Sequence, residues 1–338
     1  MKQVSVIILN WNGADMLRRF LPSVVANSPE ADVIVADNGS TDSSLEMLRA
    51  EFPEVGIIAL DRNYGFAEGY NRAIAAAQTP YTVLLNSDVE VTPHWLEPLI
   101  SFMNDNPNAA ACQPKLRDYK NKAMFEYAGA CGGFIDGLGY PYCRGRVMSV
   151  VEKDEGQYDG APASVFWATG AALLVRTSVY NEVGGLDERF FAHQEEIDLC
   201  WRLKSRGYGV YCVPESVVYH VGGATLNKSN PRKTFFNFRN NLLMLYKNLP
   251  DRRLRAVMVY RFLLDYIAAY QMLLSGRPAD FRAVVKARSE YSHIKHEFDE
   301  KRRKNLEAAT VANIAEQKPR SLLWQYYVKR VRRFCDIK

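Results

Sequence analysis

The 338-residue sequence lacks several features that would assign it at once to a familiar class of protein. Its six cysteines include no CxxC pair and no zinc-type spacing, so we expect buried free thiols in a reducing compartment. No stretch contains the roughly 18 to 20 uninterrupted apolar residues that span a bilayer. The apolar run at the N-terminus is too short for a signal peptide, and we interpret it as a buried first strand.

A dinucleotide-binding motif is also absent. GxGxxG follows none of the predicted strands, which argues against a Rossmann domain for a nicotinamide or flavin cofactor. The sequence contains no internal repeat and no long low-complexity tract. With 48% hydrophobic and 24% charged residues, the composition is that of an ordinary globular protein.

Short apolar runs alternate with helical patterns in the first hundred residues. Runs typical of strands buried on both faces occupy residues 4–9, 32–36, 56–60 and 81–85. Helical spacing of apolar residues follows each of the first three runs. This alternation predicts an α/β fold, with a mostly parallel central sheet and helices on both faces.

Polar residues follow each of the four predicted strands. They are Asn10, Asp37, Asn63 and Asp88. Ligand sites in parallel sheets lie beyond the carboxyl ends of the strands, and these ends share one edge of the sheet. We therefore expect a nucleotide site within residues 1–108.

The segment LLNSDVEV, residues 84–91, is the strongest local signal for a metal. A strand would place Asn86 and Asp88 on one face, with Ser87 between them. A divalent cation that holds a diphosphate needs a carboxylate with oxygen neighbours. An Asp that caps a turn after a buried strand is the simpler alternative, and these residues alone leave both interpretations open.

Two other segments carry polar and glycine residues in suggestive places. Asp37 ends the second predicted strand, where it is placed to accept a hydrogen bond from a base or a ribose. A plain strand–turn–helix connection explains Gly39 and Asp42, but not a carboxylate at position 37. Gly65, in the segment 62–73, permits close approach of the backbone to a ligand.

The order of these motifs along the chain resembles a known family. The segments concerned are NWNG, DNGSTDSS, NYGFAEGYNRA, LLNSDV, FWATGAALLVR, GGLDERFFAHQEEIDLCWRLKSRGY and YHVGG. Over about residues 3–250 they resemble family 2 glycosyltransferases of the GT-A fold, most of all the rhamnosyltransferase-like branch that builds bacterial surface polysaccharides. The resemblance implies inverting, metal-dependent transfer of rhamnose, or of another deoxyhexose or hexose, from a nucleoside-diphosphate sugar to a glycan or lipid-linked glycan.

The resemblance also implies where the nucleotide binds. Asp37 would bind the base, and the backbone near Asn10 would line the same pocket. Asn63 and Gly65 would lie along the base and the ribose.

A divalent cation, Mg²⁺ or Mn²⁺, is implied at the place of the family's DXD motif. Here Asn86, Ser87 and Asp88 occupy that place, so Asp88 alone would be the ionised metal ligand. His220 follows another apolar strand, and a lone histidine is more often structural. In the family, however, a histidine at this position approaches the metal or the diphosphate.

An acidic cluster marks the predicted acceptor side. Glu195, Glu196 and Asp198 open a helix predicted over residues 194–206. An inverting transfer needs a carboxylate to deprotonate the acceptor hydroxyl, although the helix dipole also favours acidic residues in a first turn. By resemblance Glu196 matches the catalytic base, but as Glu where many relatives carry Asp, so Glu195 and Asp198 remain candidates.

The floor beneath donor and acceptor is expected at Trp167, Thr169 and Gly170. The ring of Trp167 offers a face for a sugar, and packing in the core is the alternative. Residues 109–165 lose the strand–helix alternation, which predicts either an irregular insert or a second sheet.

The last quarter of the sequence is basic. Residues 251–338 hold 20 Lys and Arg against 10 Asp and Glu, whereas the preceding residues hold 23 against 28. We divide the chain into a catalytic domain, 1–250, with nucleotide-sugar-binding and acceptor-binding halves at 1–108 and 109–250, and a helical extension, 251–338.

Within this extension, residues 254–274 are interpreted as a buried or interfacial helix rather than a span, with Arg261 and Asp265 able to pair across one turn. Basic residues with interfacial aromatics suit an anionic membrane surface, at the inner face of the cytoplasmic membrane. A solvated appendage or a homodimer arm is the alternative, and we expect no nucleic acid partner.

Two other functions fit parts of the sequence. A nucleotidyltransferase shares the parallel sheet and the acidic metal site, but it needs a dense glycine-rich phosphate loop, which NWNGADMLRR does not supply. A non-catalytic nucleotide-sugar-binding protein would leave the cluster at residues 195–198 unexplained.

Overall fold

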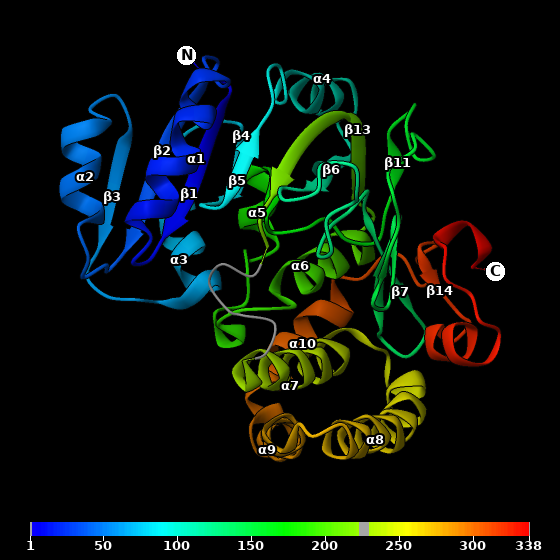
Figure 1. Cartoon of the computed structure of the whole chain (residues 1–338). Helices are drawn as coiled ribbons and strands as arrows, with labels where there is room; N and C mark the ends of the chain where they lie inside the picture. The colour runs from blue at the N-terminus through cyan, green and yellow to red at the C-terminus, as the bar shows by residue number, and fades with distance from the viewer. Residues whose placement is uncertain (1, 223–229, 338) are drawn as a thin grey trace.

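The N-terminal half of the central sheet is parallel. The computed structural model, shown in Figure 1, describes residues 2–222 and 230–337. Four parallel strands stand in the order β4–β1–β2–β3. Their bounds are β1 Val4–Asn10, β2 Ala31–Asn38, β3 Gly56–Leu60 and β4 Tyr81–Asn86, and the connecting helices are α1 Ala14–Ala26, α2 Ser44–Glu51 and α3 Gly65–Ile74.

The sheet continues beyond β4 with strands from the second half of the chain. The order there is β4–β12–β6–β13–β11, with β5 paired to β13. The bounds are β5 Val89–Val91, β6 Ala109–Asp118, β11 Ala163–Ser164, β12 Ala172–Arg176 and β13 Gly209–His220. Strand β12 is antiparallel to both neighbours, whereas β6 and β13 are parallel to each other. The predicted α/β class with a central sheet that is largely parallel is confirmed.

A second, five-stranded sheet has four of its strands between residues 133 and 151, within the region 109–165 for which an irregular insert or a second sheet was predicted. For the two ends of that region the prediction was wrong, because β6 and β11 belong to the central sheet. The order of the second sheet is β10–β9–β8–β7–β14. The bounds are β7 Gly133–Asp136, β8 Pro141–Cys143, β9 Arg146–Val147, β10 Val150–Val151 and β14 Gln317–Lys318. Because β14 comes from the end of the chain and pairs with β7, the C-terminal segment is part of this sheet.

The remaining α-helices pack against strands of the central sheet or against one another. They are α4 Glu97–Asp105, α5 Thr177–Glu182, α6 Glu195–Ser205, α7 Pro231–Asn248, α8 Asp251–Leu274, α9 Pro278–Ile294 and α10 Asp299–Glu307. Helices α7, α8 and α9 form a layer below the sheets in Figure 1. Helix α9 packs against both α7 and α8, so the basic extension is joined to the rest of the chain through α7 as well as through β14.

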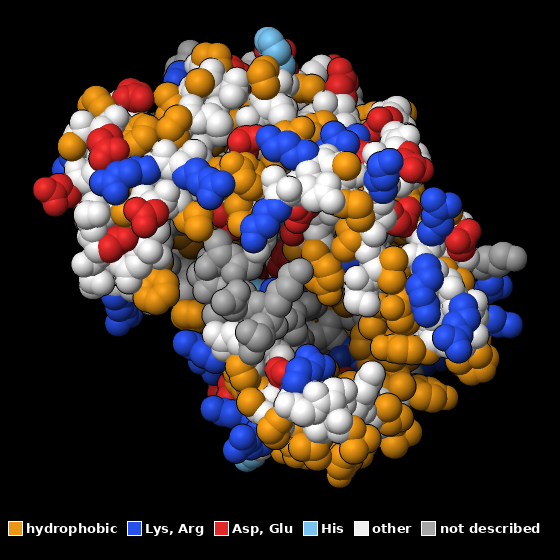
Figure 2. All heavy atoms as spheres, in the orientation of Figure 1, with side chains coloured by type: hydrophobic (Ala, Val, Ile, Leu, Met, Phe, Trp, Pro, Cys, Tyr) orange, Lys and Arg blue, Asp and Glu red, His pale blue; other side chains and the backbone are white. Residues whose placement is uncertain are grey.

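Helix α8 is unusually exposed for a helix of its apolar character. It is long and apolar enough, by length and composition, to cross a membrane, and 22% of its most apolar window is buried. Its buried positions form one stripe, Val257, Arg261, Asp265 and Ala269. The predicted pair is confirmed, because Arg261 Nε lies 3.2 Å from Asp265 Oδ1. The other faces carry apolar side chains, visible along the lower edge of the molecule in Figure 2.

The cysteines agree with the expectation of free thiols. All six are free, and five of them are buried. The sixth, Cys335, is exposed near the C-terminus.

Candidate active site

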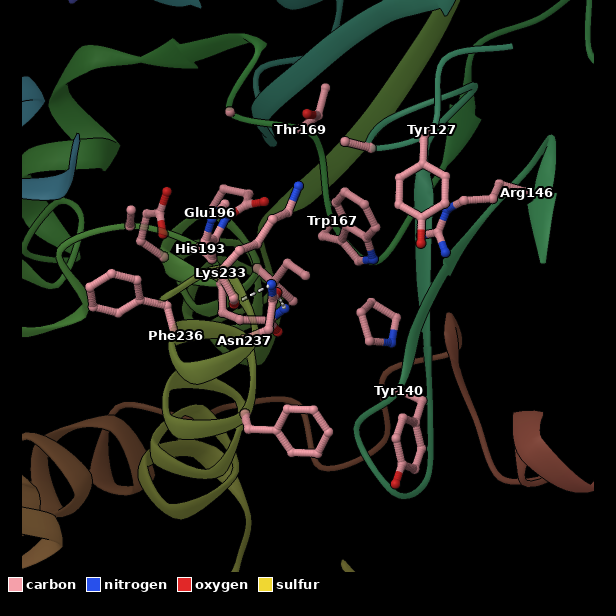
Figure 3. A pocket seen from close by; sticks show the side chains of 18 of the residues that line it. Tyr127, Tyr140, Arg146, Trp167, Thr169, His193, Glu196, Lys233, Phe236 and Asn237 are labelled. Carbon is pink, nitrogen blue, oxygen red and sulfur yellow. Dashed lines mark hydrogen bonds between the residues drawn. The ribbon is translucent and has the colours of Figure 1, made fainter. Parts of the chain in front are cut away.

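A large cavity runs along the carboxyl edge of the parallel strands. Its volume is about 2350 Å³. It is lined by strand ends of the central sheet, by the start of α6, by α7 and α8, and by strands of the second sheet. Figure 3 shows Glu196 and His193 at one side of this cavity and Tyr127 and Arg146 at the other. The cavity therefore joins the two predicted halves, the donor side and the acceptor side.

The Asn-Ser-Asp segment and His220 meet in the cavity. Asn86, Ser87, Asp88 and His220 all line it. His220 Nε2 lies 3.1 Å from Asp88 Oδ1 and 3.4 Å from Asn86 Nδ2. They meet because β13, which ends at His220, pairs with β5 directly after the segment.

The charges at this end of the cavity are strongly coupled. Burial alone would raise the pKa of Asp88, but the hydrogen bond and the charge of His220 outweigh it and lower that pKa. Burial would likewise lower the pKa of His220, but the carboxylates of Asp88 and Glu126 raise it to about 10. Glu126 Oε1 lies 3.4 Å from His220 Nδ1. Sequence reasoning missed Glu126, because it lies in the region without recognisable periodicity.

Asn63 and Gly65 lie in the cavity wall beside a residue that was not predicted, Asn38. The side chain of Asn38 donates to Asn63 Oδ1 and to the carbonyl of Gly65, at 3.1 and 2.9 Å. Gly65 has a φ of +77°, and a Cβ there would lie 2.5 Å from the ring of Phe191. Glycine is required at this position, since it brings the start of α3 against the loop that precedes α6.

Asp37 and Asn10 lie behind the cavity wall rather than in it. Both are fully buried and absent from the cavity lining. Asp37 accepts hydrogen bonds from Asn10 Nδ2 and from the backbone N–H of Ser40, each at 3.0 Å. In this conformation the carboxylate of Asp37 holds the turn after β2, and Asn38 is the residue of that turn that faces the cavity.

The loop before α6 is strained. Phe191, His193 and Gln194 have φ values of 64°, 71° and 73°, in the region that favours glycine. The carbonyl of Phe191 accepts a hydrogen bond from Phe66 N at 2.7 Å, and Asn240 Nδ2 donates to the carbonyl of His193 at 2.8 Å. Such strain persists only where surrounding contacts hold it, and it is concentrated at functional sites. Here it aims the start of α6 at the cavity.

Glu195 and Glu196 line the cavity at this helix start, and each has a buried oxygen, Oε2, without a hydrogen-bond partner among the described residues. Burial raises the pKa of Glu196 to about 7. Burial and the neighbouring charge of Glu196 raise the pKa of Glu195 well above its ordinary value. Both carboxyls therefore resist ionisation in the folded protein.

Asp198, the third candidate base, is placed elsewhere. It is fully buried, lies outside the cavity lining, and is 2.8 Å from Lys247 Nζ and 3.0 Å from Arg202 Nε. Lys247 also pairs with Asp187 at 2.5 Å. Despite its burial, these cations lower the pKa of Asp198, and its role in the structure is to join α6 to α7.

Trp167, Thr169 and Gly170 all line the cavity, as predicted for its floor. Trp167 is also part of the core, because it is 2% exposed and its Nε1 donates to the carbonyl of Phe134 at 2.9 Å. A Cβ at Gly170 would lie 3.7 Å from Glu196 Cβ, so this glycine backs directly onto the acidic pair.

Two polar residues that line the cavity and were not predicted are His193 and Arg146. Burial lowers the pKa of His193 to about 4, so its imidazole is neutral at physiological pH. The motif FFAHQEE, in which it closely precedes the acidic cluster, is the signal that could have identified it. Arg146 stands in a segment that resembles no motif.

Comparison with known proteins agrees with this geometry. A model of "Glycosyl transferase family 2" matches residues 5–133, and one of "Glycosyl transferase family group 2" matches residues 81–275. The N-acetylglucosaminyl-diphospho-decaprenol L-rhamnosyltransferase of Mycobacterium tuberculosis is 29% identical over 232 residues, which are 64% of this chain and 75% of that protein. The rhamnosyltransferase WbbL of Escherichia coli is 24% identical over 260 residues, 74% of this chain and 94% of that protein.

Among solved structures, GalNAc-T7 with UDP, GalNAc and Mn²⁺ superposes with a TM-score of 0.61 at 16% identity. The superposition covers 89% of this chain and 57% of that one. The fold and the cavity at the strand ends thus define a glycosyltransferase of the GT-A type. More particularly, the chain belongs to the family 2 glycosyltransferases, since the second family model spans more than half of it. The expected resemblance to rhamnosyltransferases and the expected glycosyl transfer activity are confirmed.

Proposed function

We propose that this enzyme transfers a sugar, rhamnose or another deoxyhexose or hexose, from a nucleoside-diphosphate donor to a hydroxyl of a lipid-linked glycan, with inversion. The observation that carries the proposal is the acidic pair in the same cavity as the Asn86–Asp88 segment. The names of the two relatives favour rhamnose and, for one, a diphospho-polyprenol acceptor. The relatives also argue against nucleotidyl transfer.

Glu196 is the proposed general base. A base that works near neutral pH needs a pKa near 7, which is the value to which burial raises the Glu196 carboxyl. Burial and the neighbouring charge of Glu196 raise the pKa of Glu195 and so favour its protonated form, and Asp198 is bound to Lys247 away from the cavity. Ionised Glu196 takes the proton of the acceptor hydroxyl while the oxygen of that hydroxyl attacks the anomeric carbon of the donor sugar. The leaving diphosphate departs on the opposite face, so the configuration inverts.

A divalent cation, Mg²⁺ or Mn²⁺, is proposed at Asp88 and His220. The pKa of about 10 keeps His220 protonated in the metal-free cavity, so His220 would lose that proton in order to ligate the cation. The described residues include no group of three or more His, Cys, Asp or Glu that could hold a metal. A site of this kind suits a cation whose other positions are filled by the diphosphate and water. When bound, it would neutralise charge on the leaving diphosphate. Asn86 and Ser87 border the same position, and Asp88 keeps its charge because its pKa is low.

The nucleotide is proposed to lie along Asn38, Asn63 and Gly65, in the wall that these residues share. Asp37 and Asn10 stand directly behind that wall. Their proposed part is to fix the turn after β2, with contact to the base if the wall opens. Trp167, Thr169 and Gly170 form the floor under the sugar.

The experiment is a donor panel with Mg²⁺ or Mn²⁺, read by mass spectrometry, with a synthetic lipid-linked glycan as acceptor. We expect one donor to give glycosylated acceptor and free nucleoside diphosphate, and nuclear magnetic resonance to show inversion at the anomeric carbon. Release of pyrophosphate would favour nucleotidyl transfer. Retention of configuration would contradict the role of Glu196.

The outer face of α8 is proposed to bind an anionic membrane surface. Val259, Leu263 and Leu274 are 64%, 56% and 88% exposed, and Phe262 is exposed beside them. A helix that is apolar on all sides is normally buried, and basic residues of the extension flank this one. Such a surface suits an enzyme whose acceptor is anchored in a bilayer.

Flotation with vesicles tests the membrane proposal. We expect binding to vesicles of phosphatidylcholine with phosphatidylglycerol, weaker binding to phosphatidylcholine alone, and loss of both in Phe262→Ser/Leu263→Ser. Light scattering without lipid tests whether this face is instead a dimer interface. If the wild-type protein is a dimer and the same double variant is a monomer, the outer face of α8 binds a second copy of the chain.

A further inference from the structure

One buried cation in the cavity has no acidic partner among the described residues. Eight Lys and Arg residues in the part of the chain that the structure describes are buried, and they are Lys115, Arg146, Arg202, Lys204, Arg239, Lys247, Arg261 and Arg302. Seven of them have a carboxylate within 4.0 Å. Within residues 2–222 and 230–337 Arg146 has none, although it is only 7% exposed.

The contacts of Arg146 are neutral. Its guanidinium donates to the carbonyl of Met148 at 3.2 Å and to Cys143 Sγ at 3.3 Å, and it lies 4.9 Å from the ring centre of Tyr127. Its Nε has no hydrogen-bond partner among the residues described. Glu126 acts on it only at longer range. A buried charge without a counter-ion is costly, so this position suits a ligand that brings an anion.

Arg146 faces the cavity from the second sheet, not from the nucleotide end. It belongs to β9 and stands opposite Glu196 in Figure 3. Ser149, three residues further on, lies 3.2 Å from the hydroxyl of Tyr326 in the C-terminal turn Trp324–Val328. The buried cation thus lies between the acidic pair and the C-terminal turn.

The far end of the cavity is apolar and open to solvent. Its wall includes Ile267 of α8, together with Trp324, Tyr327 and Val328 of the C-terminal turn. These four side chains are 64%, 58%, 53% and 51% exposed. Large apolar side chains that line a cavity and still face water lose that exposure when an apolar ligand covers them.

The size of the cavity fits a second substrate. Small-molecule sites typically occupy about 300 to 1,000 Å³. The cavity, at about 2350 Å³, is more than twice that size, so a nucleotide sugar leaves a large part of it free. Beyond Glu196 the cavity therefore contains first the cation of Arg146 and then the apolar wall formed by α8 and the C-terminal turn.

We propose that Arg146 binds the diphosphate of a polyprenyl-diphosphate-linked acceptor, and that the wall formed by α8 and the C-terminal turn receives its isoprenoid chain. This proposal rests on the proposed lipid-linked acceptor and adds its anchoring group and its binding site. In this arrangement the acceptor sugar lies at Glu196, its diphosphate at Arg146, and its lipid along Ile267 and Trp324 toward the outer face of α8.

Calorimetric titration of the full chain with farnesyl diphosphate and with farnesol tests whether Arg146 binds a diphosphate, and it requires no sugar transfer. We expect the wild-type protein to bind farnesyl diphosphate more tightly. Because a buried hydrogen bond to a charged group is strong, Arg146→Gln should weaken that binding on the order of 10- to 100-fold, with the affinity for farnesol unchanged. Arg144→Gln is the matched control, since Arg144 is in the same hairpin but outside the cavity lining.

The outcomes separate the two possible sources of the diphosphate. If wild-type protein binds farnesyl diphosphate no better than farnesol, the proposal is overturned whatever the variants do. If Arg146→Gln instead weakens binding of the donor's nucleoside diphosphate, Arg146 belongs to the donor site and the proposal is equally wrong. Both results are independent of the transfer assay, so the proposed function can fail or succeed separately.

Chain length tests the apolar wall. Geranyl, farnesyl and geranylgeranyl diphosphates should bind progressively more tightly to wild-type protein, because each isoprene unit buries further apolar surface. Ile267→Ser should remove most of this dependence, while Tyr270→Ser should keep it. Both residues are on α8, 64% and 57% exposed, but only Ile267 lines the cavity. Equal effects of the two substitutions, or no dependence on length, would refute the lipid site.

Discussion

Replacing Glu196 with Gln should make the folded protein more stable at alkaline pH. Burial raises the pKa of this carboxyl from 4.5 to about 7. One pKa unit corresponds to about 1.4 kcal/mol, so ionised Glu196 destabilises the folded chain by on the order of 3 kcal/mol. The folded state holds its proton more tightly than the unfolded state, so stability is lost as the pH rises from about 4.5 to about 7. The neutral amide of the Glu196→Gln variant would carry no such penalty.

Urea denaturation of both proteins at pH 4.5 and pH 8 measures this difference. We expect the two free energies of unfolding to be similar at pH 4.5, and the variant to be more stable by on the order of 2 to 3 kcal/mol at pH 8. Glu46→Gln, at an exposed position of α2, serves as the control and should show no such difference. A variant that is less stable than wild type at pH 8 would refute the description of Glu196 as a buried carboxyl that resists ionisation.

The same substitution should abolish most of the transfer activity. Loss of a general base typically costs about 10²- to 10⁴-fold in rate. In the wild-type protein kcat/KM should rise about tenfold per pH unit below pH 7 and level off above it, since only ionised Glu196 accepts the proton. Full transfer by Glu196→Gln, with loss of transfer in Glu195→Gln, would assign the base to Glu195.

Three further substitutions test other parts of the site. Asp88→Asn should bind nucleoside diphosphate with the same affinity with and without Mn²⁺ in calorimetry, and a persistent Mn²⁺ effect would exclude the metal role. Lys247→Met removes the buried cation that Asp187 and Asp198 share and leaves Asp198 with Arg202 alone. This change should lower the free energy of unfolding by on the order of 3 to 5 kcal/mol, so a loss smaller than about 1 kcal/mol would contradict the ion-pair network. Gly65→Ala places a Cβ 2.5 Å from Phe191 and should weaken nucleotide binding, measured by titration. Unchanged affinity would show that this contact is not needed.

The parallel half of the fold could be predicted because its signal is local. The runs 4–9, 32–36, 56–60 and 81–85 differ from the observed strands by no more than two residues at any end. The runs of β1 and β4 are apolar because these strands are buried on both faces, so burial is encoded in consecutive residues. Burial on both faces was wrongly expected for β3, which is the edge strand and has no buried residue. Convergence of the strand-end residues was only partly predictable. Parallel topology brings the strand ends to one edge, but it does not decide which side chain faces the ligand.

Asp37 illustrates that difference. Its position at the end of β2 was predicted, yet its side chain turns inward to Asn10 and to the backbone of Ser40, and Asn38 faces the cavity instead. A single residue step reverses the face of a strand, and the turn after it follows from contacts distant in sequence. Asp198 is similar, since the helix start was predicted while its pairing with Lys247, 49 residues later, was not.

The second sheet was predicted only as one of two alternatives, and none of its strands could be located from local signals. Strands β9, β10 and β14 have two residues each, too short for any periodicity. Arg146 therefore carried no signal in the sequence, and its importance follows from the lack of a carboxylate near it among the described residues. The division of the chain at residue 250 remains a prediction.

The buried stripe of α8 has a consequence for how that helix is oriented. A helix with apolar residues on every side gains nearly the same burial at any rotation about its axis. Arg261 and Asp265 remove this freedom, because Arg288 of α9 pairs with Asp265 at 2.5 Å and Arg261 donates to the carbonyl of Leu138 at 3.1 Å. Rotation by even a third of a turn would separate these charges. The ionic contacts thus fix the rotation of α8 about its axis, and this rotation decides which row of apolar side chains faces the cavity.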